Sequence, residues 1–74
     1  MKEKMNKIFK TVFQIDNNIE TFKKDGNDKW DSINHLNLIV EIESEFDIDI
    51  DPDDMQRIKD FDSALIVVKS KINL

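Results

Sequence analysis

The 74-residue chain contains no cysteine, and only one glycine and one proline. Without cysteine it can form neither disulfide bridges nor thiolate zinc sites, which stabilise many domains of this size. Its single histidine, His35, argues against a histidine-based metal site. So few glycine and proline residues leave little material for the turns of a many-stranded fold. The composition therefore favours one small domain, residues 1–74, stabilised by helix packing.

The charge balance is acidic, with 11 basic and 16 acidic residues and a formal net charge of −5. Residues 41–62 hold ten of the acids against Arg57 and Lys59, a local net charge of −8. Such a chain repels nucleic acid and anionic membranes and favours partners with basic surfaces. The first residues lack the apolar stretch of a secretory signal, and the longest apolar run, Ala64–Val68, is too short to span a membrane. With the absence of cysteine, this predicts a cytoplasmic protein without membrane insertion.

Apolar residues recur at helical spacing in four segments, three longer and one short. In the first, Met5, Ile8 and Phe9 begin a stripe along one face of an amphipathic helix. We expect a long loop over residues 16–31, in which Ile19, Phe22 and Trp30 are apolar anchors. The predicted helices run from about Lys2 to Ile15, from Asp31 or Ser32 to Phe46, from Pro52 to about Ile58, and from Phe61 to about Ile72.

Three aspartates stand where helix caps are expected. Asp31 precedes the second helix, Asp51 precedes Pro52 at the first position of the third, and Asp60 precedes the fourth. Residues 47–51 alternate aspartate with isoleucine, which is also a strand-like pattern. Since no matching segment exists to pair with it, we interpret it as an extended loop with Ile48 and Ile50 turned inward. The predicted fold is all-α, a small four-helix bundle with a long first loop.

The second helix carries more apolar surface than one core contact requires. Placed at 100° intervals, its residues fall into a core arc, a second apolar edge beside Glu43, and a polar side. The apolar edge either covers a neighbouring loop or docks a partner, and the pattern favours neither reading. The core arc comprises His35, Leu38, Ile39, Ile42 and Phe46; the edge comprises Ile33, Leu36 and Val40; the polar side comprises Asn34, Glu41, Ser44 and Glu45.

Candidate catalytic and metal-binding patterns are weak. Asp47, Asp49 and Asp51 have the first ligand spacings of a calcium-binding loop, but Pro52 and Ile58 replace its essential glycine and glutamate. Ser32 and His35 stand three residues apart, without the orienting acid and oxyanion hole of a hydrolase. We therefore expect a protein that is not an enzyme and holds no dedicated metal.

The region from residue 31 onward resembles the acyl carrier proteins, whose signature is Asp-Ser-Leu at the start of a second helix that ends in Glu-x-Phe. Here residues 30–46 read Trp-Asp-Ser-Ile-Asn-His-Leu-Asn-Leu-Ile-Val-Glu-Ile-Glu-Ser-Glu-Phe. An acidic loop ending in Ile48-Asp49-Ile50, a Pro-Asp-Asp opening of a short helix and an apolar last helix follow, as in that family. The resemblance covers residues 31–72 without a gap, and the first helix more loosely.

The resemblance implies that Ser32 carries 4′-phosphopantetheine, which a magnesium-dependent phosphopantetheinyl transferase installs from coenzyme A, with Asp31 as the helix cap beside it. Acyl groups are then held as thioesters on the terminal thiol of the arm. Implied partners are this transferase and acyl-loading, condensing or acyl-transfer enzymes with basic docking surfaces, meeting a monomeric carrier. The expected partner-binding residues are Ile33, Leu36, Val40, Glu41, Glu43 and Asp47.

The sequence departs from the family pattern at several positions around the serine. Lys29 and Trp30 replace small residues, Ile33 replaces leucine, and Asn34 and Asn37 stand where fatty-acid carriers often have acids. Trp30 and His35 on either side of the serine are more typical of discrete carriers of specialised pathways. The expected function is therefore that of a discrete acyl carrier protein of a type II fatty-acid, polyketide or other specialised system. The alternatives are an aminoacyl or peptidyl carrier, an unmodified acidic helical adaptor, and a small calcium-binding domain.

Overall fold

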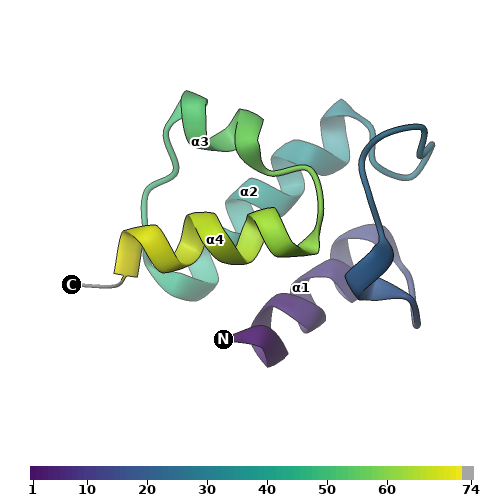
Figure 1. Cartoon of the computed structure of the whole chain (residues 1–74), viewed down its shortest axis with the longest axis horizontal. Coiled ribbons are helices and arrows are strands. Elements are labelled where there is room, and N and C mark those ends of the chain that lie inside the picture. The colour runs from purple at the N-terminus through teal and green to yellow at the C-terminus, as the bar shows by residue number, and fades with distance from the viewer. Residues whose placement is uncertain (73–74) are drawn as a thin grey trace.

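The computed structural model describes residues 1–72, which fold into four α-helices and one short 3-10 helix (Figure 1). The four predicted helices are all present, and the second and fourth have the predicted bounds. The described part of the chain is therefore a small all-α fold. Its elements are α1 (Lys2–Phe13), η1 (Ile19–Thr21), α2 (Ser32–Phe46), α3 (Pro52–Arg57) and α4 (Phe61–Ile72).

Helix α1 ends at Phe13, two residues before the predicted end at Ile15. Gln14 adopts a left-handed conformation with φ 55°, and its backbone N–H donates to the carbonyl of Lys10. The Ile15 N–H donates to the same carbonyl, so the chain reverses direction here. After the reversal, the half-buried Ile15 packs against the core.

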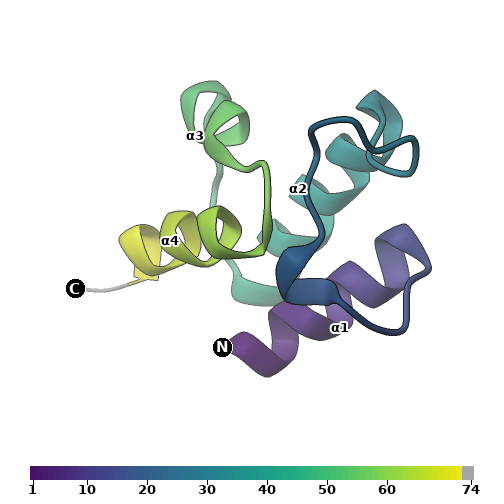
Figure 2. The ribbon, with the colours of Figure 1, turned by 45° about the vertical axis from the view of Figure 1, so that its right-hand side comes forward.

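The long first segment is more ordered than the predicted loop over residues 16–31. It contains η1, and it runs from the end of α1 past α4 toward the start of α2 (Figure 2). A single antiparallel backbone bridge joins Lys23 to Asp60, with the Lys24 N–H donating to the Lys59 carbonyl at 2.8 Å. The predicted anchors hold the segment in place, since Ile19 and Trp30 are buried and Phe22 is half-buried.

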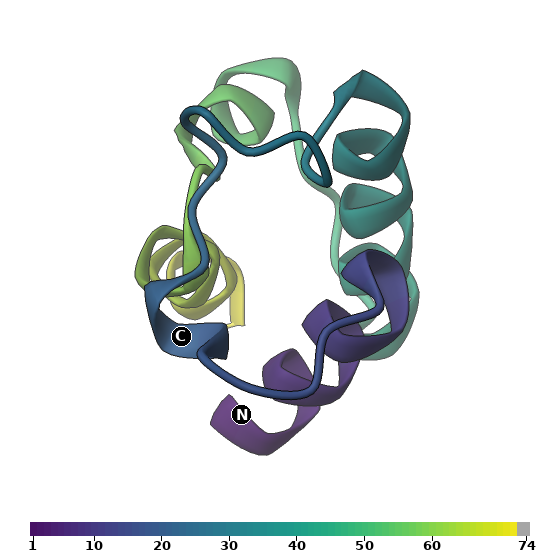
Figure 3. The same ribbon diagram turned by 90° about the vertical axis from the view of Figure 1, so that its right-hand side faces the viewer.

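Figure 3 shows the helices arranged around a common centre. The buried apolar residues come from every helix except α3, whose half-buried Met55 packs against them and which is followed by the buried Ile58. Phe9 lies at the centre of an aromatic group and makes edge-on contacts with Phe13, Trp30 and Phe61 at centroid distances of 5.4, 5.6 and 5.4 Å. The buried apolar residues are Met5, Ile8, Phe9, Phe13, Ile19, Trp30, Leu38, Ile39, Ile42, Ile50, Ile58, Phe61, Ala64, Leu65, Val67 and Val68.

The predicted caps of α2 and α3 are confirmed, and Asp60 has the same role at α4, where its Oδ1 accepts from the Ser63 N–H at 2.7 Å. Helix α3 ends at Arg57, one residue earlier than predicted, because the backbone at Ile58 becomes extended and turns its side chain into the core. In the preceding loop, Ile50 is buried and Ile48 half-buried, which confirms the predicted inward orientation.

Candidate functional site

Ser32 is the first residue of α2, and its side chain is exposed. The chain enters the helix through Asp31, which has an extended backbone and whose Oδ1 accepts a hydrogen bond from the Asn34 N–H at 2.8 Å. A second contact fixes the same turn, because the Asn34 side-chain amide donates to the Lys29 carbonyl at 2.7 Å. Ser32 is thus a solvent-accessible hydroxyl on a well-defined first helical turn.

The first turn of α2 suits an attached phosphate. The N–H groups at a helix start have no intrahelical acceptors, and the helix dipole makes this end partly positive. The Asp31 side chain accepts a hydrogen bond from the Asn34 backbone N–H. The backbone N–H groups of Ser32 and Ile33 lie just before it in the same turn. A phosphodiester on the Ser32 hydroxyl would lie beside these groups, where negative charge is stabilised.

An exposed apolar edge continues along α2 from Ser32. Ile33, Leu36 and Val40 leave 71%, 57% and 59% of their surface in solvent. They lie on one side of the helix, while Leu38, Ile39 and Ile42 face the core. No described loop covers this edge, so the reading in which it packs under a neighbouring loop is wrong. The edge is instead available to another molecule.

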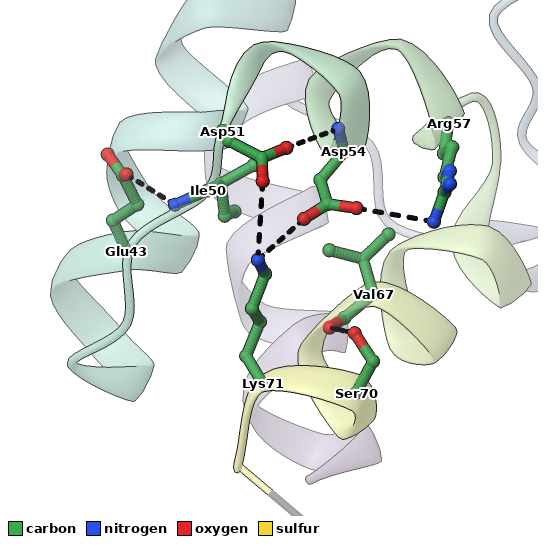
Figure 4. Close-up of polar contacts among 8 residues, drawn as sticks. All are labelled: Glu43, Ile50, Asp51, Asp54, Arg57, Val67, Ser70 and Lys71. Carbon is green, nitrogen blue, oxygen red and sulfur yellow. Dashed lines mark hydrogen bonds and ion pairs between the residues drawn. The ribbon is translucent and has the colours of Figure 1, made fainter.

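The three acidic residues predicted to bind partners have different surroundings. Glu41 borders a shallow hollow between α2 and α1, opposite Lys4 and Lys7. Glu43 is half-buried, and its Oε2 accepts a hydrogen bond from the Ile50 N–H at 2.9 Å, which fastens the loop before α3 to α2 (Figure 4). Asp47 is exposed and ends α2 in a left-handed conformation. Of the three, Glu43 thus has a structural role that the sequence did not reveal.

A partly buried hydrogen-bonded linkage lies at the first turn of α2. The Trp30 Nε1–H donates to His35 Nδ1 at 2.9 Å, and His35 Nε2 lies 2.9 Å from the carbonyl oxygen of Met55. Trp30 is only 3% exposed and packs against Phe9 and Phe13. His35 was expected in the core arc of α2, and it is half-buried there with both ring nitrogens hydrogen-bonded.

A second polar cluster ties α3 to the last turn of α4 (Figure 4). Lys71 Nζ lies 2.7 Å from Asp54 Oδ2 and 3.7 Å from Asp51 Oδ2, and Asp54 is nearly buried. The hydrogen bond with Asp54 raises the pKa of Lys71. The hydrogen bond from the Asp54 backbone N–H lowers the pKa of Asp51. The cluster secures the short helix α3, and sequence analysis did not predict it.

The structure gives no support to a calcium-binding loop. The Asp51 carboxylate is already engaged by the Asp54 N–H and by Lys71, while Asp47 is the left-handed residue that follows the last residue of α2. Within residues 1–72, no three histidine or acidic side chains gather closely enough to hold a metal ion. The same stretch of chain includes no helix with the length and apolar character needed to cross a membrane.

Comparisons of the chain with protein-family models, with curated proteins and with solved structures give no match.

Proposed function

We propose that the protein is a discrete acyl carrier in which Ser32 bears a covalent 4′-phosphopantetheine arm. The observation that carries this proposal is the position of Ser32, exposed at the first residue of a helix capped by Asp31 and followed by an exposed apolar edge. The same residues carry the resemblance to acyl carrier proteins. A type II fatty-acid, polyketide or other specialised pathway would use such a carrier to present acyl thioesters to its enzymes.

Loading requires little chemistry from the carrier itself. In the proposed transfer, Ser32 Oγ attacks the phosphorus that bears the pantetheine group of coenzyme A. The bond to the other phosphate breaks, adenosine 3′,5′-bisphosphate leaves, and a base of the transferase takes the hydroxyl proton. The carrier supplies an accessible nucleophile and a helix start that favours the new phosphodiester. The thiol that holds the acyl group comes with the arm, and the chain itself has no cysteine.

The partner enzymes would dock on the apolar edge of Ile33, Leu36 and Val40. In this proposal they meet it with an apolar pocket ringed by lysine and arginine, because residues 41–62 of the carrier hold a net charge of −8. Apolar burial would supply affinity, and the acidic surroundings would steer basic partners toward Ser32. An interface of this kind uses the one apolar surface of α2 that the core leaves free.

The proposal is tested by intact mass spectrometry after incubation with coenzyme A, magnesium and a broad-specificity phosphopantetheinyl transferase. One arm should add to the parent, none to Ser32→Ala, and one to the matched control Ser44→Ala, whose serine is exposed on the same helix. Ser63 and Ser70 should not react, because their hydroxyls are hydrogen-bonded within α4 and its cap. No addition, or addition at a serine other than Ser32, would contradict the proposal.

The same experiment separates a carrier from an unmodified adaptor, but it does not separate the two kinds of carrier. An aminoacyl or peptidyl carrier would be modified at the same serine, and only the identity of its thioester cargo would distinguish it from an acyl carrier. An unmodified acidic adaptor would keep its unmodified mass while retaining the helical circular dichroism of the parent. The exposed serine at the start of α2 favours a carrier over an adaptor, since an adaptor requires no nucleophile there.

A further inference from the structure

The linkage through His35 joins three segments that are separate in the sequence. Trp30 ends the long first segment, His35 lies in the first turn of α2, and Met55 belongs to α3. Because a carbonyl oxygen can only accept, His35 Nε2 must carry the proton and donate it to Met55. His35 Nδ1 is then an acceptor, as the Trp30 N–H requires. One neutral imidazole tautomer satisfies both hydrogen bonds, so the ring orientation is fixed.

Ser32 lies between Trp30 and His35 in the sequence. Trp30 is two residues before it and His35 is three residues after it, so their hydrogen bond closes a short loop around the serine. Within that loop, the His35 backbone N–H donates to the Asp31 carbonyl at 2.9 Å, which is the first backbone bond of α2. Trp30 is in turn held by the aromatic group around Phe9. The direction in which Ser32 leaves the surface is therefore coupled to the core and to α3.

We infer that His35 is a positioning residue for the modification of Ser32, an inference that rests on the proposed carrier function. A transferase must find the serine and the neighbouring edge of α2 in one arrangement, and the linkage keeps that arrangement populated. If the linkage is lost, the first turn and α3 move independently and only a fraction of molecules is competent to bind. The apparent KM then rises by the reciprocal of that fraction, while kcat stays unchanged once the complex has formed.

The experiment compares transferase kinetics on four variants. His35→Leu removes both hydrogen bonds, Trp30→Phe removes only the indole donor, and His35→Gln keeps one acceptor and one donor. Met5→Ala is the matched control for lost stability, because Met5 is fully buried but distant from Ser32. Its neighbour Lys4 lies over the ring of Phe46, at the opposite end of α2. Each variant is assayed at a temperature where circular dichroism shows at least nine-tenths of it folded.

Losing one hydrogen bond of ordinary net strength shifts such an equilibrium by about two- to twelvefold. Because the parent is mostly competent, KM rises less than the equilibrium shifts; we expect KM for the carrier to rise about three- to tenfold in His35→Leu, which loses both bonds, and less in Trp30→Phe, with kcat unchanged in both. His35→Gln should restore KM to within about twofold of the parent. Met5→Ala should keep the parent KM, because a small unfolded fraction changes the effective carrier concentration only slightly.

Fluorescence gives a reading that is independent of the transferase. Trp30 is the only tryptophan and the chain has no tyrosine, so the emission reports on this indole alone. The emission wavelength should change in His35→Leu, because the indole loses its hydrogen-bond acceptor, and it should remain at the parent value in His35→Gln and Met5→Ala.

The outcomes distinguish this inference from the carrier function. If the parent is modified at Ser32 and His35→Leu has the parent KM and emission, the positioning role is wrong and the carrier function stands. If Met5→Ala raises KM as much as His35→Leu does, general stability explains the effect and the inference is again overturned. If His35→Leu does not fold, Trp30→Phe decides by its KM. If the parent is not modified at all, both proposals fail.

Discussion

Replacing Val40 by arginine tests whether the apolar edge of α2 is a docking surface. Val40 is the last of the three exposed apolar residues on this side of α2, and 59% of its surface is in solvent. Full burial of such a side chain contributes about 1.5–3 kcal/mol of favourable free energy. Docking can bury only the part of Val40 that is still exposed, so its contribution to binding is about 1–2 kcal/mol. Losing this contact alone should weaken binding about five- to thirtyfold.

Arginine adds a second penalty at this position. In the proposed complex, a partner complementary to this acidic protein would present lysine and arginine around its pocket, so the new cation would oppose it and also slow encounter. The fold should barely respond, since an exposed substitution away from caps and core changes the free energy of unfolding by about 0.5 kcal/mol or less. The expected result is thus a loss of transferase kcat/KM without a comparable loss of thermal stability.

The assay measures transferase kcat/KM at sub-saturating carrier together with circular dichroism melts. Ile66→Arg is the matched control, because Ile66 is 66% exposed but lies on α4, a different helix from Ser32. The control should react like the parent. Equal rates for Val40→Arg and Ile66→Arg would refute the docking surface. Unfolding of Val40→Arg would show that the edge supports the fold instead.

Three further predictions concern stability. Hydrogen bonds from the side chain and then the backbone of Ser63 lower the pKa of Asp60 from its ordinary value of 3.8. Their contribution to the stability of the fold is therefore complete above that pH and is lost as the pH falls through the lowered pKa. Melting temperatures should drop below about pH 4, and they should drop less steeply in Asp60→Asn. Lys71→Met should lower the melting temperature more than Lys69→Met does, because it leaves the nearly buried Asp54 without its 2.7 Å partner, and equal effects would refute the role of this ion pair. Melting temperatures should rise from low to moderate sodium chloride, because screening relieves repulsion within residues 41–62, and a flat or falling series would contradict this.

Local signals in the sequence were sufficient to predict the helices and the start of α2. Asp31 before Ser32 is a cap signal that acts within one turn, and the structure contains that cap. The exposed edge also followed from local spacing, since three apolar residues fall outside the arc that a bundle interior requires. The sequence left open whether a loop covers this edge, and the exposure of Ile33, Leu36 and Val40 answers that question.

The features that sequence analysis missed depend on distant partners. Lys71 pairs with Asp54 across 17 residues, and the His35 ring reaches a backbone carbonyl 20 residues away. Every residue has a backbone carbonyl, so the sequence pattern could not indicate the contact between His35 and the Met55 carbonyl. The early end of α1 was missed because the apolar spacing of Ile8 and Val12 continues to Ile15, while the left-handed backbone at Gln14 leaves no signal in that spacing.

The most direct test of the carrier function is the mass of the Ser32 peptide from protein purified out of the cells that encode it. Trypsin cleaves after Lys29 and Arg57 and releases residues 30–57, which contain Ser32 and Ser44. We predict a peptide heavier by one phosphopantetheine, with or without an acyl group on its thiol, and fragmentation that places the addition on Ser32. A peptide of unmodified mass throughout, or an addition on Ser44, would contradict the account.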